Sequence, residues 1–88
     1  MVTQTIGDIN FFGFGLDGYK AHDQAQHSSN ANITYYGFLN RLGEWYIMEQ
    51  TISGTTFSYR FAKGSSAYTT NWTNRESLTY GYLNVIFA

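Results

Sequence analysis

The chain has 88 residues, a length typical of one small domain. It contains no cysteine, so disulfides and thiolate chemistry are excluded. The formal net charge is −1 and only 12% of the residues are charged, which argues against a nucleic-acid partner because such binding needs a basic face. A domain of this size buries roughly 60–65% of its unfolded surface. We therefore expect additional stabilisation from a homo-oligomer or a larger assembly.

The first 32 residues are predicted to form an N-terminal arm or linker, which precedes a single small β domain at residues 33–88. Residues 20–32, KAHDQAQHSSNAN, are polar and show no apolar periodicity. Upstream, Phe11, Phe12 and Phe14 form an aromatic cluster suited to anchoring the arm on a neighbour. The first ten residues lack the pattern of a signal peptide, and no apolar run approaches the ~20 residues of a membrane-spanning helix, so no membrane partner is expected.

The sequence GFGLDG at residues 13–18 has the glycine spacing of a dinucleotide-binding loop. That fold also requires a helix after the loop and an acidic residue about 20 positions further on. Here polar residues without helical periodicity follow Gly18, and the corresponding later positions, FLN, hold no acid. We expect a tight turn at Asp17-Gly18 and no bound cofactor.

Three short strands are predicted at residues 34–39, 44–50 and 57–62, separated by turns at residues 40–43 and 53–54. Side chains on alternate positions of a strand share a face. The side chains predicted to share faces are Trp45 with Ile47, Tyr46 with Met48, and Phe57 with Tyr59 and Phe61. The fold class is therefore all-β, a small antiparallel meander in the form of a twisted sheet or partial barrel.

The C-terminal part is predicted to contain a helical turn and a final strand. Thr73 followed by Glu76 fits a capping box, which favours a helical turn near residues 74–78, with an irregular loop as the alternative. Residues 78–87, LTYGYLNVIF, carry apolar groups at both odd and even positions. A strand that is apolar on both sides is covered on both sides, and a neighbouring chain could provide the second cover.

The polar groups predict neither a metal site nor an enzyme. His22, Asp23 and His27 do not share one helix face, and the chain has no further His or Cys to complete four ligands, so a solvated linker is favoured. A metal on a symmetry axis, with one histidine from each subunit, is the alternative. Glu44 and Glu49 lie on opposite faces of one predicted strand and cannot flank a glycosidic bond.

Exposed aromatic side chains give the most informative pattern, because a thin sheet cannot bury all of them. Core and subunit interface is the favoured interpretation, since Tyr and Trp are enriched at interfaces. The alternative is a glycan-binding face on which sugars stack on Trp45 or Trp72. The predicted interface residues are Phe11, Phe12, Phe14, Tyr80, Tyr82, Val85 and Phe87.

The motifs YYGFL, GEWYIM, YRFAKG and YTTNWTNRESLTYGYL follow one another over residues 35–83. Together they form a YYG…WYI…YR.AKG…NWT.R block that resembles a recurring block in small uncharacterised proteins of tailed bacteriophages, encoded among virion genes. The block covers a little over half of the chain, and residues 1–30 lie outside it. The resemblance implies a virion-associated protein that works by surface complementarity in many copies.

The expected function is a structural component of a tailed-bacteriophage virion, with capsid decoration as the first choice. Its partners would be other copies of itself and virion proteins such as the major capsid protein. One alternative is a tail or tail-fibre adhesion module that binds host-surface glycan. Another is a small phage-encoded inhibitor of a host protein.

Overall fold

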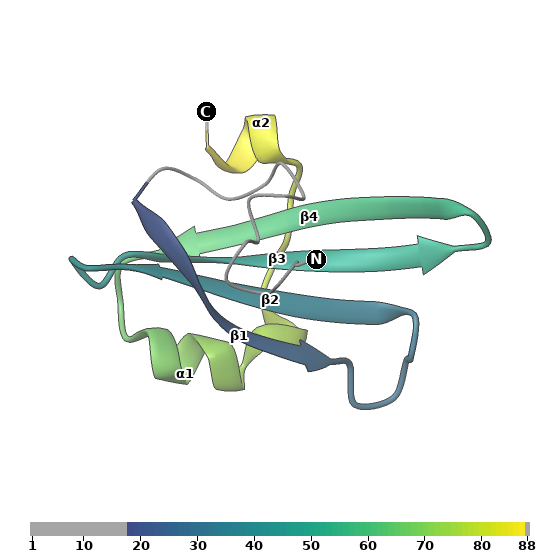
Figure 1. Ribbon diagram of the computed structural model, residues 1–88, viewed down its shortest axis with the longest axis horizontal. Helices are drawn as coiled ribbons and strands as arrows, with labels where there is room; N and C mark the ends of the chain where they lie inside the picture. Colours follow the sequence, from purple (N-terminus) through teal and green to yellow (C-terminus); the bar gives the residue numbers. More distant parts are fainter. Residues whose placement is uncertain (1–17, 88) are drawn as a thin grey trace.

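The computed structural model describes residues 18–87 and has a four-stranded antiparallel sheet at its centre (Figure 1). The strands lie side by side in chain order, which confirms the predicted all-β meander. The elements are β1 (Tyr19–Gln26), β2 (Ile33–Asn40), β3 (Trp45–Ser53), β4 (Thr56–Gly64), α1 (Tyr68–Thr73), the 3₁₀ turn η2 (Arg75–Ser77) and α2 (Leu83–Ile86). The three predicted strands correspond to β2, β3 and β4.

The polar segment at residues 20–32 is not a linker throughout, and this prediction is wrong for β1. Residues from Tyr19 to Gln26 pair antiparallel with β2, with a register shift between Ala21 and Asp23. The strand alternates between half-buried and exposed positions, but the residues that turn inward include Ala21, Asp23 and Ala25. These side chains are small or polar, so the alternation carries no apolar signal. The sheet therefore begins at Tyr19, before the expected domain start at residue 33.

The final strand predicted at residues 78–87 is also wrong. Only Gly81 pairs with the sheet, through an isolated antiparallel bridge to Phe61, and the chain then forms α2. The apolar residues of this segment pack first against one face of the sheet and then, further along the chain, against the other face. Leu78 and Tyr80 pack on one face, and Ile86 and Phe87 pack on the other.

Each face of the sheet carries its own apolar core. Figure 1 shows α1 on one side of the sheet and α2 on the other. The α1-side core consists of Tyr35, Trp45, Ile47, Ala62 and Tyr68. The α2-side core consists of Tyr36, Phe38, Tyr46, Met48 and Phe61. The predicted alternation in β3 is thus confirmed, since consecutive residues enter opposite cores.

The turn between β2 and β3 is built around Asn40, and it confirms the turn predicted at residues 40–43. The Asn40 side-chain oxygen accepts hydrogen bonds from the backbone N–H groups of Leu42 and Glu44, both at 2.9 Å. Its amide nitrogen donates to the Glu44 carboxylate at 2.7 Å. Gly43 has a φ of +87°, a conformation that L side chains rarely adopt.

Replacing Asn40 by alanine is expected to lower the free energy of unfolding by about 1–2 kcal/mol, because two backbone donors in the turn lose their partner. Urea denaturation followed by tryptophan fluorescence measures this loss. The matched control is Asn84→Ala in α2, where the side chain makes no hydrogen bond within the described residues. Equal stability of the two variants would contradict the role assigned to Asn40.

The helical turn predicted near residues 74–78 is present as η2, and α1 immediately before it was not predicted. The predicted capping box is not formed. The Thr73 hydroxyl donates to the carbonyl oxygen of Thr69 at 3.0 Å, and η2 has no side-chain cap. The Glu76 carboxylate binds Ser28 in the β1–β2 connection instead.

Candidate interaction surface

The C-terminal segment passes over the outer edge of β4 and joins the two faces of the sheet. The N–H of Phe61 donates to the Gly81 carbonyl at 2.7 Å, and the N–H of Gly81 donates to the Phe61 carbonyl at 2.9 Å. Before this bridge Tyr80 lies on the α1 side, where its hydroxyl donates to the Arg75 carbonyl at 2.8 Å. After it, Phe87 packs edge-on against Tyr46 on the α2 side. The segment is therefore anchored on both faces.

Between these anchors lies an exposed apolar surface, which we call the C-terminal apolar patch and define as Tyr82, Leu83 and Val85. Their exposed fractions are 57%, 40% and 65%. The Tyr82 hydroxyl accepts a hydrogen bond from Arg60 at 3.2 Å, and the Arg60 guanidinium lies 4.9 Å from the centre of the Tyr82 ring. Neighbouring exposed apolar side chains on one element are a feature of interaction sites.

The structure divides the predicted interface residues into two groups. Tyr82 and Val85 are exposed and available to a partner. Tyr80 and Phe87 are half-buried and pack against the two cores, so their rings stabilise the fold. Leu83 belongs to the same exposed surface but is not among the predicted interface residues. Phe11, Phe12 and Phe14 lie outside the described residues.

Trp45 is buried, and Trp72 is half-buried with ring contacts inside the chain. Trp45 is 4% exposed, and its indole N–H donates to the Ser66 carbonyl at 2.7 Å. Trp72 stacks on Tyr68, and the Arg75 guanidinium lies 4.7 Å from the centre of its ring. The burial of Trp45 therefore argues against sugar stacking on that residue. Trp72 packs against other residues of the chain.

One polar network joins α1 to β1. The Tyr68 hydroxyl donates to the Asp23 carboxylate at 2.8 Å, and His22 contacts the same oxygen at 2.7 Å. Burial raises the pKa of the Asp23 carboxyl, but the hydrogen bonds from His22 and Tyr68 outweigh it, so the net shift of the pKa is downward. No sequence spacing links Tyr68 to Asp23, and sequence reasoning did not identify this contact.

A second polar network joins η2 to the β1–β2 connection. The Glu76 carboxylate accepts hydrogen bonds from the backbone N–H and the hydroxyl of Ser28, both at 2.8 Å. His27 lies 3.5 Å from the same carboxylate. The hydrogen bonds from Ser28 lower the pKa of Glu76. Both carboxylate oxygens are engaged by Ser28, so Glu76 acts as a clamp between two segments that lie far apart in the sequence.

The two histidines singled out in the sequence are thus drawn to different partners, His22 to Asp23 and His27 to Glu76. Residues 18–87 contain no group of three or more His, Asp or Glu residues placed to hold a metal ion. Glu44 lies in the turn before β3, and Glu49 accepts a hydrogen bond from the Tyr35 hydroxyl at 3.0 Å. Of the GFGLDG motif only Gly18 is described, with a φ of +86°.

No helix within the described part of the chain is long and apolar enough to cross a membrane. Comparison of the chain with models of known families finds no match, and comparison with curated proteins and with solved structures finds no significant one.

Proposed function

We propose that the protein is a structural component of a tailed-bacteriophage virion, with capsid decoration as its role, and that it assembles through the C-terminal apolar patch. The observation that carries the proposal is the exposure of Tyr82, Leu83 and Val85 on a segment that both cores anchor. An anchored segment loses little conformational freedom on binding, so more of the gain from burying apolar surface remains as affinity.

The energetics of this patch suit a protein that works in many copies. Burying a Leu or Val side chain from full exposure contributes about 1.5–3 kcal/mol. Three partly exposed side chains therefore support a weak single contact. Repetition of that contact over a lattice raises the overall avidity without any new interaction. A decoration protein on a capsid has this arrangement, whereas an inhibitor of one host protein needs a single tight contact.

The resemblance to tailed-phage proteins adds support for the virion assignment. The residues that carry it run from β2 through β3, β4, α1 and η2 to Leu83 at the start of α2, and they include core residues such as Tyr35 and Trp45. The block thus covers the sheet, the helix packed on it, and Tyr82 and Leu83 of the C-terminal patch. The adhesion alternative is less favoured because Trp45 is buried.

Light scattering of the purified chain across a range of concentration tests the proposal. We expect a mass above that of the 10.0 kDa monomer, rising with concentration. Leu83→Ser combined with Val85→Ser should return the protein to a monomer with an unchanged circular dichroism spectrum. The control is Leu42→Ser, which removes an equally apolar and 77% exposed side chain from the β2–β3 turn.

A second measurement separates a virion role from the other candidates. A decoration protein should be abundant in purified phage particles, and the doubly substituted chain should be lost from them. A wild-type chain that remains monomeric at every concentration and is absent from particles would overturn the proposal.

A further inference from the structure

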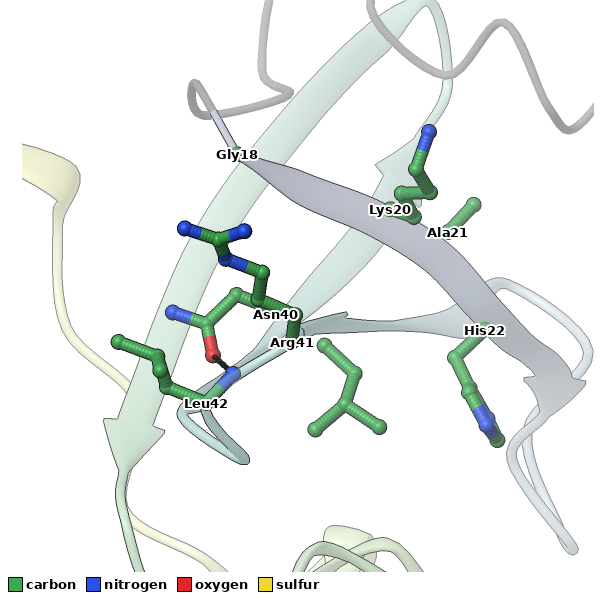
Figure 2. Close-up of a pocket in the computed structure, with 8 residues that line it drawn as sticks. Gly18, Lys20, Ala21, His22, Asn40, Arg41 and Leu42 are labelled. Carbon is green, nitrogen blue, oxygen red and sulfur yellow. Dashed lines mark hydrogen bonds between the residues drawn. The ribbon is translucent and has the colours of Figure 1, made fainter.

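A second surface feature lies away from the C-terminal apolar patch. An open pocket of about 600 Å³ is formed between β1 and the β2–β3 turn (Figure 2). Its volume falls within the range of about 300–1,000 Å³ that small-molecule sites occupy. The apolar part of its lining comes from Leu39 and Leu42, while Ala21 also borders the pocket but packs its side chain against the α2-side core. Leu42 is 77% exposed, so its side chain is accessible to a ligand.

The charged part of the lining is cationic. Lys20 from β1 and Arg41 from the turn both line the pocket, and among residues 18–87 no Asp or Glu lines it. Within residues 18–87 neither cation takes part in an ion pair, since the two pairs present are formed by histidines. The nearby Glu44 carboxylate is held by the Asn40 amide. The positive charge at the pocket is therefore not neutralised by described residues.

The turn side of the pocket is held in place before any ligand arrives. Figure 2 shows the hydrogen bond from the Leu42 backbone N–H to the Asn40 side-chain oxygen, which is 2.9 Å long. A second bond, from the Glu44 N–H to the same oxygen, closes the turn around Arg41 and Leu42. A fixed turn of this kind reduces the entropy cost of binding, because the backbone that carries both side chains is already ordered.

We propose that this pocket binds a small organic anion with an apolar body, such as a carboxylate on an aliphatic chain. The anionic group would lie between Lys20 and Arg41, where the positive charge lacks a described partner. The chain would lie on Leu39 and Leu42. An apolar wall with a few charged groups that fix orientation is the usual composition of such sites. The proposal goes beyond the virion role and does not rest on it, since the pocket and the C-terminal patch share no residue.

Amide NMR of the isotope-labelled protein with octanoate as the probe tests the proposal. We expect saturable shifts concentrated at residues 18–22 and 39–42. Octanol, which keeps the chain but lacks the charge, and acetate, which keeps the charge but lacks the chain, should each bind at least about tenfold more weakly.

Substitutions separate this site from general binding to apolar surface. Lys20→Gln and Arg41→Gln should each weaken octanoate binding by about fivefold, which is the effect of losing one modest charge contact. Leu42→Ser should weaken it as well. The matched controls are Arg60→Gln, an exposed cation outside the pocket, and Leu83→Ser on the C-terminal patch, and both should leave the affinity unchanged.

Three outcomes would overturn the proposal. One is the absence of saturable shifts with octanoate. Another is equal binding of octanol, which would make the cations irrelevant. The third is shifts centred on α2 that disappear in Leu83→Ser, which would assign the binding to the C-terminal patch. Dispersed amide spectra of each variant establish that the fold is intact.

Discussion

The Gly37→Ala substitution is expected to lower the free energy of unfolding by about 2–4 kcal/mol relative to the wild type. Gly37 lies in the middle of β2, where α1 rests directly on the backbone. A β-carbon at this position would collide with the Tyr68 hydroxyl and would lie 3.0 Å from two ring carbons of Trp72. Asp23 is the cross-strand partner of Gly37, and the Tyr68 hydroxyl passes over the glycine to reach it. The added methyl therefore both overpacks the contact and displaces a charge-assisted hydrogen bond.

Urea denaturation of four proteins checks this explanation: wild type, Gly37→Ala, Tyr68→Phe and the double variant. Removing the hydroxyl makes room for the new methyl, so Gly37→Ala should cost about 1 kcal/mol less in the Tyr68→Phe background. Strict additivity would show that the collision lies elsewhere, and a wild-type stability of Gly37→Ala would show that α1 does not rest on this residue.

Alkaline pH is expected to unfold the protein cooperatively. Burial raises the pKa of Tyr35, Tyr68 and Tyr80 above the ordinary value of 10.0, and hydrogen bonds to Glu49 and Asp23 raise the first two further. Because the pKa values are higher in the folded state than in the unfolded state, the stabilisation is complete below pH 10 and is lost as the pH rises above it. Each such tyrosine lowers the free energy of unfolding by up to about 1.4 kcal/mol per pH unit in that range.

The measurement is a pH titration that follows circular dichroism and the ultraviolet absorbance of tyrosinate together. We expect most tyrosinate signal to appear in the same transition in which the sheet is lost. Tyr80→Phe should make the fall of stability with pH less steep. Tyr82→Phe removes the hydroxyl of a side chain that is already 57% exposed and should leave the midpoint unchanged. Full ionisation with an intact sheet would contradict the burial of these hydroxyls.

The sequence predicted the central sheet well because its strands alternate between two apolar cores. Trp45 and Ile47 enter one core, and Tyr46 and Met48 enter the other, so β3 is visible from the order of its residues. The turn after Asn40 was also visible in the sequence, because it ends in a glycine. The structure gives the reason for that glycine, since Gly43 has a positive φ.

The missed elements are those whose stability comes from distant partners. After Tyr19, β1 turns inward with small or polar side chains, and one of them, Asp23, gains its partner from α1, 45 residues later. The short α1 consists mainly of residues with low helix propensity, and it is held by the packing of Tyr68 and Trp72 over Gly37. Neither contact can be inferred from local pattern.

The path of the C-terminal segment was not predicted, and the reason lies in its apolar pattern. Residues 78–87 carry apolar groups at both odd and even positions, and this pattern was interpreted as one strand covered on both sides. The structure shows that the chain changes sides instead, so only the residues at the crossing, such as Tyr82 and Val85, remain exposed. A two-sided apolar segment after a complete sheet can therefore indicate a chain that crosses an edge.

The crossing at Gly81 also limits how sheets from different copies could join. A strand that added to β4 would have to displace Gly81 from both of its hydrogen bonds to Phe61. On either side of Gly81 the chain is held against opposite faces, by Tyr80 on one and Phe87 on the other, so it cannot swing away as a unit. Open-ended growth into fibres by strand addition is thereby opposed at this edge. At the β4 edge, neighbouring molecules can therefore make side-chain contacts while their sheets stay separate.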